Sequence, residues 1–540
     1  MIRKMIKLIV FIVIGVAVFF AIQDVLTPSH DGSENTSRII KGYEALEDGV
    51  VDVLFLGPST TIYGVSPMRI YEDSHIISYS LATAGQPVEC SYYLLEKAYQ
   101  TQAPKVVFLD AGSLYYDTSA NGAWRYVLDN LPMDKVKWDF AKYYGQMDFG
   151  DGFWSAVFPI IKYHTRWKEL SINDFLDVKG QLYYSMGGII NSMVNPTSWS
   201  NSDIRNTTQK LLEKESGNIT FYNGTEIKEK TIEEPLYAPE VSERNLEYLE
   251  KLQDMCEKMG TELVLIHMPK RIYPPQLSSS TWTQYKSKIV KEIADDLDLT
   301  FLELEYDYDL GMDYQTDTLD SGHHLNIRGA EKVSDFLVEY LSSNYNLSQT
   351  QITEYEESLP LYQSAREIAY LQTQKDFTSY IQRLQQSISD WTILIVAKEE
   401  YTSGMSNEDY ALLESMGLKL IREGNYTDSY VAVIRQGEVR YEAVSDREIT
   451  YRATLDGNVV NMKSSGWNSP SLGQGSIKIG KKEYAKDTRG LNIVIWDHET
   501  EMVIDSVVFD TYREDKPATR SWRTINSYLR AYESAVCFNQ

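Results

Sequence analysis

The sequence predicts an α/β protein in which a parallel, helix-flanked sheet is followed by a smaller, β-rich domain. Three observations lead to this prediction. Short apolar runs alternate with helical patterns in the first part of the chain, which is typical of parallel strands connected by helices. After residue 390 the pattern changes to strands and turns. The length of 540 residues exceeds what one hydrophobic core serves and indicates two or three domains.

The first segment, residues 1–29, is predicted to be a membrane anchor. Basic side chains at its start precede an apolar run from Leu8 to Ile22. Such a run is compatible with a signal peptide or an anchor, and the lack of small residues at both cleavage-defining positions around Phe20 favours an uncleaved anchor. By the positive-inside rule, the N-terminus is expected in the cytoplasm and the bulk of the chain outside it, as a single-pass protein of the cell membrane.

The predicted strands of the sheet are Val51 to Leu56, Val106 to Asp110 and Glu262 to Met268. The helical patterns around them cover residues 91–100, 244–258 and 283–295. Residues 111–240 interrupt the alternation with sequence rich in Trp, Tyr, Asn and Ser, and are expected to form a cap or insertion. Because sites in open α/β folds lie at the carboxyl edge of the sheet, the loops after these strands are the expected place of a site.

The loop after the first predicted strand holds a candidate nucleophile. Ser59 follows Gly57-Pro58 on a tight turn, where its hydroxyl is expected to project from the carboxyl edge of the sheet. A serine hydroxyl needs a general base, and the segment from Asp320 to Gly329 offers two adjacent histidines preceded by a carboxylate. Gly, Pro and Ser also dominate ordinary turns, and Asp320 also fits a helix cap, so the combination carries the prediction.

Gly57-x-Ser59 together with Asp320-x-x-His323 resembles the SGNH/GDSL hydrolase superfamily. A wider set of segments is similar to the membrane-anchored SGNH-like proteins of Gram-positive bacteria, and more distantly to proteins that acylate teichoic acids and exopolysaccharides: Ser78 to Pro87, Pro104 to Asp110, Tyr163 to Trp167 and His324 to Lys332. The resemblance covers residues 38–346. It implies a flavodoxin-like parallel sheet and a serine esterase or O-acyltransferase.

The resemblance also implies roles for individual residues. His324 fits a His-x-Asn-x-x-Gly pattern and is expected to be the general base, oriented by Asp320, while His323 fits Asp-x-x-His and is held in reserve. Ser80 and Gly85 are expected to contribute to an oxyanion or substrate-binding site.

Two departures from the superfamily pattern bear on this site. Ser80 and Ala82 stand where an asparagine or glycine is usual, and the third block, from Asp110 to Ser113, lacks the usual asparagine. Two further histidines, His164 and His267, are expected to be structural rather than to line the site.

Residues 347–374 are predicted to form a helical connector, and residues 513–540 an amphipathic helical tail. The domain between them, residues 375–512, has predicted strands at Trp391 to Ala397, Ser429 to Ile434, Leu491 to Trp496 and Ile504 to Phe509.

This domain resembles the interleukin-like EMT inducer (PANDER-like) domain, most specifically in Arg489 to Asn492 and Phe509 to Thr511. The resemblance implies a glycan-targeting module. Trp467, on a turn-like segment, is a candidate to stack on a sugar ring, and packing within the domain is the alternative.

Composition limits the classes of partner. The net charge of −25 and the pI of about 4.8 argue against nucleic acid, which requires clustered Lys and Arg. Cys90, Cys256 and Cys537 have no metal-ligand spacing, and nothing in the sequence indicates a metal or another cofactor.

The sequence therefore predicts a membrane-anchored, extracytoplasmic SGNH-type esterase or O-acyltransferase. The expected substrate is a cell-surface glycan or acylated polysaccharide. The alternative is a non-catalytic surface protein that keeps the SGNH fold and binds a glycan or an envelope partner. Ser80, Ala82 and the extra residue before His324 motivate that alternative.

Overall fold

The computed structural model of the chain contains two compact units, each described here by itself. The N-terminal unit comprises residues 1–190 and 194–362, and the C-terminal unit comprises residues 191–193 and 363–540. The structure describes residues 2–28, 36–116, 122, 124–145, 147, 152–170, 174, 185–194, 217–222, 227–232, 240–270, 277–320, 322–386, 391–455, 457–497 and 502–520.

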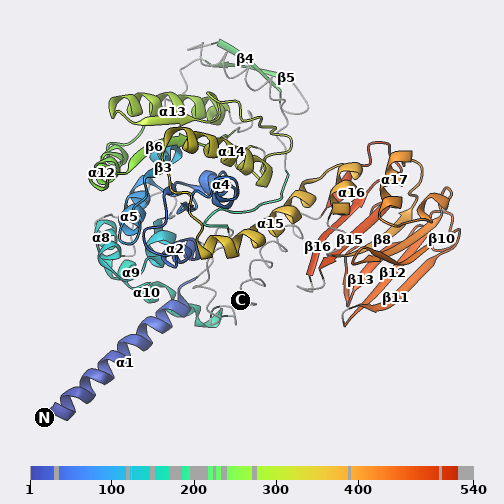
Figure 1. Cartoon of the computed structure of the whole chain (residues 1–540), viewed down its shortest axis with the longest axis horizontal. Helices are drawn as coiled ribbons and strands as arrows, with labels where there is room; N and C mark the ends of the chain where they lie inside the picture. Colours follow the sequence, from blue (N-terminus) through green and yellow to red (C-terminus); the bar gives the residue numbers. More distant parts are fainter. Residues whose placement is uncertain are drawn as a thin grey trace. The chain divides into compact units, whose positions relative to one another are not determined.

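The N-terminal unit is built on a five-stranded sheet in which all neighbouring strands are parallel (Figure 1). Its strands are β1 (Val53–Leu56), β2 (Ser78–Ser80), β3 (Val106–Asp110), β6 (Glu262–His267) and β7 (Thr300–Glu303). They lie in the order β2-β1-β3-β6-β7. Counted along the chain this is the order 2-1-3-4-5, which is that of flavodoxin-like doubly wound folds. The predicted parallel α/β sheet is thus confirmed.

Helices cover both faces of this sheet. Helix α5 contacts α12, α4 contacts α14, and Figure 1 shows the sheet between these two pairs. The helices of the unit outside the expected insertion are α1 (Ile2–Leu26), α2 (Thr36–Glu44), α3 (Ser59–Ile62), α4 (Pro67–Ser74), α5 (Val88–Ala98), α12 (Glu243–Met259), α13 (Leu277–Asp296) and α14 (Ile327–Asn344). Helix α15 (Thr353–Thr373) runs across the boundary of the two units.

The core of the N-terminal unit follows from the sequence of its strands and of α14. All residues of β1 and β3 are buried, as expected for strands covered on both faces. Val333, Leu337 and Leu341 form an apolar stripe with a period of one helical turn, and they join the strand side chains in one cluster.

The expected insertion at residues 111–240 is described only in part. Its described elements are η1 (Ala111–Tyr115), α7 (Trp124–Asn130), α8 (Lys135–Tyr144), α9 (Phe153–Val157), α10 (Ile160–Tyr163), η2 (His164–Lys168) and a hairpin of β4 (Gly217–Tyr222) and β5 (Ile227–Ile232). Helix α8 packs against α5, so this part of the insertion is joined to the sheet domain through the helix that follows β2.

The C-terminal unit contains a ten-stranded mixed sheet. Its strands are β8 (Thr392–Glu399), β9 (Ser429–Arg435), β10 (Glu438–Ser445), β11 (Ile449–Leu455), β12 (Asn458–Gly466), β13 (Gly475–Ile479), β14 (Lys482–Glu483), β15 (Gly490–Asp497), β16 (Met502–Phe509) and β17 (Ala518–Arg520). The unit also contains α16 (Phe377–Gln386), α17 (Asn407–Ser415) and η6 (Ile421–Glu423). Strand β8 is central, antiparallel to β9 and β15 and parallel to β12. A separate β-rich domain is therefore confirmed.

The end of the chain differs from the expected helical tail where it is described. Residues 518–520 form β17, which pairs antiparallel with Val507 to Phe509 of β16. Edge pairing with a buried strand decides the local structure there. Residues 521–540 lie outside the described residues.

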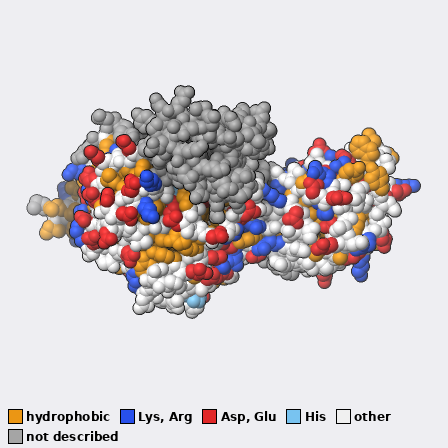
Figure 2. Space-filling model, turned by 90° about the horizontal axis from the view of Figure 1, so that it is seen from above, with side chains coloured by type: hydrophobic (Ala, Val, Ile, Leu, Met, Phe, Trp, Pro, Cys, Tyr) orange, Lys and Arg blue, Asp and Glu red, His pale blue; other side chains and the backbone are white. Residues whose placement is uncertain are grey.

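Both signs of charge are spread over the described surface. On the face shown in Figure 2, acidic and basic side chains are interspersed rather than segregated. Interspersed charges of this kind favour solubility, in keeping with the net charge of −25.

Candidate active site

Ser59, His324 and Asp320 form a hydrogen-bonded chain at the carboxyl edge of the parallel sheet. The Ser59 Oγ lies 2.8 Å from the His324 Nε2, and the His324 Nδ1 lies 2.6 Å from the Asp320 Oδ2. The other carboxylate oxygen of Asp320 accepts a 2.7 Å hydrogen bond from the His324 backbone N–H. With Nδ1–H donating to the carboxylate, Nε2 is left to accept the serine proton, which is the arrangement of a serine nucleophile and its base.

His323 lies beside this chain and does not join it. Its ring centroid is 6.3 Å from that of His324. Burial lowers the pKa of His323 and the Lys270 ammonium lowers it further, while the Asp320 carboxylate acts in the opposite direction. The partner of Asp320 is therefore the histidine four residues later, and the expectation of His324 as base and His323 as reserve agrees with this geometry.

The nucleophile turn is fixed to the end of the neighbouring strand β3. The Asp110 Oδ2 accepts hydrogen bonds from the hydroxyls of Thr60 and Thr61, at 2.6 and 3.0 Å, and its Oδ1 accepts one from the Gly112 N–H at 2.8 Å. A Cβ on Gly57 would lie 2.6 Å from the Asp110 Cβ, so this position excludes larger residues. The Gly-Pro-Ser-Thr-Thr sequence thus docks the turn on Asp110.

Strands β1 and β3 are neighbours at the point where the strand order reverses. In doubly wound sheets the connections on the two sides of this point leave in opposite directions and open a crevice for ligands. Ser59 follows β1 and Asp110 ends β3, so the hydrogen-bonded serine lies at the position where such folds bind ligands.

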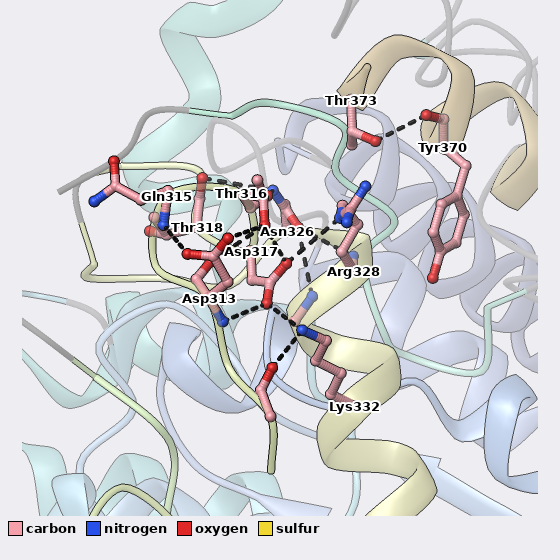
Figure 3. Close-up of polar contacts among 12 residues, drawn as sticks. Asp313, Gln315, Thr316, Asp317, Thr318, Asn326, Arg328, Lys332, Tyr370 and Thr373 are labelled. Atoms are coloured by element: carbon pink, nitrogen blue, oxygen red, sulfur yellow. Dashed lines mark hydrogen bonds and ion pairs between the residues drawn. The ribbon is translucent and has the colours of Figure 1, made fainter. Parts of the chain in front are cut away.

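The loop that carries Asp320 and His324 is anchored by a fully buried carboxylate, Asp317 (Figure 3). Its Oδ2 accepts from the Asp313 backbone N–H at 2.8 Å and from the Lys332 Nζ at 2.6 Å. Its Oδ1 accepts from the Thr316 hydroxyl at 2.9 Å and lies 3.4 Å from the Arg328 Nε. Two basic side chains of α14 thereby hold the start of the loop.

The end of the same loop is closed by the residues after His324. Asn326 caps α14, since its Oδ1 accepts from the Arg328 N–H at 3.0 Å, and its Nδ2 donates to the Thr316 carbonyl at 2.7 Å. A Cβ on Gly329 would lie 2.6 Å from the Asp317 carbonyl oxygen. The His-x-Asn-x-x-Gly pattern therefore combines the histidine that bonds Ser59, a helix cap and a site of close backbone approach.

The donors available to an oxyanion differ from those expected. Within the described part of the chain, the Ser59 N–H has no acceptor. The Ser80 N–H donates to the Met186 carbonyl at 3.0 Å, and the fully buried Ser80 Oγ has no partner among the described residues. The Ser80 amide is thus occupied by the insertion, whereas its hydroxyl has no partner among the described residues, so a contribution of Ser80 to an oxyanion or substrate-binding site stays a prediction.

Gly85 lies on the loop that follows β2, next to the nucleophile turn. The Thr83 N–H of this loop donates to the Gly57 carbonyl at 3.0 Å. Gly85 adopts φ +56°, a left-handed conformation that favours glycine. The structure places this residue in the expected neighbourhood, on a loop tied to the serine turn.

The same edge of the sheet carries His267, which was expected to be structural, and two charged residues that the sequence did not single out, Glu303 and Lys270. His267 ends β6 and its Nδ1 lies 2.8 Å from both carboxylate oxygens of Glu303 at the end of β7. Burial lowers the pKa of His267, but Glu303 raises it by more, so the pKa ends above its usual value. Burial lowers the pKa of Lys270, and the negative charges of Asp110 and Asp320 act on it in the opposite direction.

These residues could have been found from their positions in the sequence, at or just after the ends of predicted strands. A residue that ends a parallel strand, or follows it within a few positions, reaches the same edge as the nucleophile. Lys270 comes three residues after the end of β6. Met268, two residues before it, packs against the segment that follows Ser59: a Cβ on Gly64 would lie 3.2 Å from the Met268 sulfur. His164, in η2, instead bonds the Ile161 carbonyl at 2.8 Å.

An apolar cluster borders the triad. It consists of Ile62, Tyr63, Ala82, Ile189 and Leu319, and the Tyr63 ring centroid lies 5.2 Å from that of His324. The imidazole of His324 therefore lies against an apolar ring on this side.

In the C-terminal unit, Trp467 is 58% exposed on the turn after β12, and its N–H donates to the Glu399 carbonyl at 2.9 Å. A Cβ on Gly473 would lie 3.4 Å from the Cε3 of its ring, so the ring is partly exposed and partly packed against the domain, and both alternatives stay open. Among the described residues, no group of three or more His, Cys, Asp or Glu side chains is arranged to hold a metal ion.

Comparison with known families finds one match. The model of the interleukin-like EMT inducer family matches residues 362–438, which confirms the expected similarity of the C-terminal domain. The match starts in α15 and ends as β10 begins, so it starts and stops earlier than the expected 375–512. No curated protein matches the chain.

Proposed function

We propose that the N-terminal unit is a serine esterase or O-acyltransferase of the SGNH type. The observation that carries this proposal is the chain of 2.8 and 2.6 Å contacts from Ser59 through His324 to Asp320. Half-buried side chains (23% exposure for His324 and 36% for Asp320) leave the site within reach of solvent and substrate.

The reaction follows from these contacts. The Ser59 oxygen attacks an ester carbonyl while its proton passes to the His324 Nε2, and Asp320 stabilises the resulting imidazolium. The Ser59 N–H, which has no acceptor in the described part of the chain, is directed to the developing oxyanion. The imidazolium then protonates the leaving alkoxide. Water or a sugar hydroxyl, deprotonated by His324, attacks the acyl-enzyme and releases Ser59.

The proposed substrate is an acylated glycan at the cell surface. The glycan-binding role of the C-terminal unit rests on the resemblance described under Sequence analysis, and the exposed Trp467 is the residue proposed to stack on a sugar ring. Helix α1, whose most apolar 18-residue window has a mean hydropathy of 2.9, supports membrane anchoring and hence an extracytoplasmic site. Anchoring raises the effective concentration of the site at its substrate.

The second candidate is a non-catalytic surface protein that uses the same fold to bind glycan. The observation that favours it is the loss of donors: the Ser80 N–H is bonded to Met186 and the Gly112 N–H to Asp110. Each oxyanion donor that is lost slows acyl transfer about a hundredfold or more.

Labelling of the full chain in detergent with a fluorophosphonate probe separates the two. The enzyme predicts labelling that is lost in Ser59→Ala and His324→Ala and retained in His323→Ala, the matched control on the adjacent residue. A folded chain that is not labelled, or labelling that survives Ser59→Ala, would favour the binding protein. Loss in His323→Ala with retention in His324→Ala would overturn the assignment of the base.

A further inference from the structure

The segment that packs on the end of helix α1 has an unusual surface. Trp154 of α9, Ile161 of α10 and Trp167 of η2 are 60%, 49% and 64% exposed. Large apolar side chains grouped on a surface mark an interaction site more often than isolated ones do. Residues 153–168 are called the α9–η2 segment below.

This segment is attached directly to α1. The Phe158 ring meets that of Phe19 edge-on at a centroid distance of 5.8 Å, and the Trp154 ring stacks on Phe158 at 6.1 Å. Two further bonds fix the helix end: the Arg166 guanidinium donates to the carbonyls of Val25 and Leu26, at 3.1 and 3.3 Å. Figure 1 shows α10 at the end of α1.

The length of α1 places this contact at the membrane. A helix needs about 20 residues to cross the roughly 30 Å of hydrocarbon in a bilayer. The earliest point at which the hydrocarbon can begin is the first residue of α1, Ile2. The roughly 30 Å of hydrocarbon would then end about 20 residues later, near Ile22, so Phe19 lies within it. The ring that contacts Phe19 must therefore reach the bilayer boundary.

The composition of the segment suits that boundary. Trp is enriched where one side of a ring is apolar and the other wet. The Lys168 ammonium lies 5.6 Å from the centroid of the exposed Trp167 ring, so a cation is available for lipid phosphates. A neighbouring exposed ring, Trp138 of α8, lies 6.3 Å from Trp154 and extends the same surface.

We propose that the α9–η2 segment inserts its exposed side chains into the headgroup and acyl boundary of the extracytoplasmic leaflet. The occupant of this surface is the lipid bilayer, because the surface is continuous with the helix that enters it. The inference goes beyond catalysis and rests only on the proposed anchoring by α1. The catalytic unit is then held to the bilayer by a face as well as by a single helix.

The test uses the full chain in phosphatidylcholine vesicles whose acyl chains carry bromine atoms near the glycerol. Bromine quenches tryptophan fluorescence on contact, and α1 contains no tryptophan. We expect quenching of the wild-type protein, loss of the larger part of it in the double variant Trp154→Phe and Trp167→Phe, and none of this loss in Trp467→Phe. These are exposed rings, so phenylalanine leaves the fold intact.

The outcomes are distinguishable. Flotation with the vesicles measures membrane anchoring, and fluorophosphonate labelling of the same sample measures the reactivity of Ser59. A protein that floats but is not quenched, or whose quenching is unchanged in the double variant, overturns the proposal and leaves catalysis untouched. If the protein floats with the vesicles, is not quenched and is cross-linked as a dimer, the surface is assigned to a second copy of the chain. A protein that does not float refutes the anchor and the proposal together.

Discussion

Asp317 offers the sharpest test of how the loop that carries Asp320 and His324 is ordered. Its carboxylate is fully buried and bonds the Asp313 N–H and the Lys332 Nζ through one oxygen, and the Thr316 hydroxyl and the Arg328 Nε through the other. In Asp317→Asn an NH₂ group replaces one oxygen. In place of Oδ2, the NH₂ group would face the Asp313 N–H and the Lys332 ammonium, which are donors and cannot accept. It must therefore take the place of Oδ1, where the Thr316 hydroxyl can turn and accept.

The size of the effect follows from what is lost. Hydrogen bonds to a charged group contribute about 1.5–3 kcal/mol each, and neutral ones about half of that. The Lys332 and Arg328 side chains are 33% and 32% exposed, so each loss is discounted for screening by water. A loss of about 1 kcal/mol for each cation gives about 2 kcal/mol in the free energy of unfolding.

We expect urea unfolding of Asp317→Asn, followed by intrinsic fluorescence, to occur about 0.7 M earlier, for a slope of about 3 kcal/mol per M. Fluorophosphonate labelling in the absence of urea should slow about tenfold if some 1.4 kcal/mol of the loss falls on ordering of the loop. Asp309→Asn is the matched control, since Asp309 is exposed and, among the described residues, bonds only the nearby Gly311 N–H. A destabilised variant that is labelled at the wild-type rate would refute the reasoning.

Three further predictions concern the same edge of the sheet. Asp320→Asn should keep the fold and slow fluorophosphonate labelling by about a thousandfold or more, because the amide favours the wrong tautomer of the base; rapid labelling would contradict the triad. Gly329→Ala should lower the free energy of unfolding by about 1–3 kcal/mol in a urea titration, since its Cβ meets the Asp317 carbonyl oxygen at 2.6 Å; an unchanged midpoint would show that the backbone yields freely. The pKa of His267 is raised in the folded state by Glu303, so its stabilising contribution is fully present below pH 6.5 and is lost as the pH rises through the raised value. The free energy of unfolding of the wild-type protein relative to His267→Gln should therefore fall above pH 6.5, and a constant difference from pH 5 to 9 would exclude this linkage.

The sequence predicted the parts of the fold whose local pattern is strong. The buried strand at Val106 to Asp110 agrees with β3 in both bounds, because a continuous apolar run between turns has few alternatives. Strands β2 and β7 were not predicted. They have only three and four residues, and long-range pairing with β1 and β6 rather than local pattern decides them.

The candidate site was predictable in its chemistry and less so in its supports. Ser59 and His324 are marked by turn and motif residues, whereas Asp317 and Lys270 are ordinary charged residues whose roles come from burial and from neighbours distant in sequence. The occupation of the Ser80 N–H could not be predicted from the sequence, because its acceptor, the Met186 carbonyl, lies in the insertion and beyond the reach of local pattern.

Ser59 and His324 are 265 residues apart in sequence, and this separation has a consequence for synthesis and export. Ser59 emerges during synthesis soon after α1, whereas its proposed base, His324, emerges only just before α14. Until that helix has folded, no imidazole is available to remove the serine proton, and the hydroxyl stays unreactive. If the chain crosses the membrane as proposed, the nucleophile is switched on only after nearly the whole domain has been exported. On the proposed function, this order of synthesis would protect acyl esters in the cytoplasm from the newly made protein.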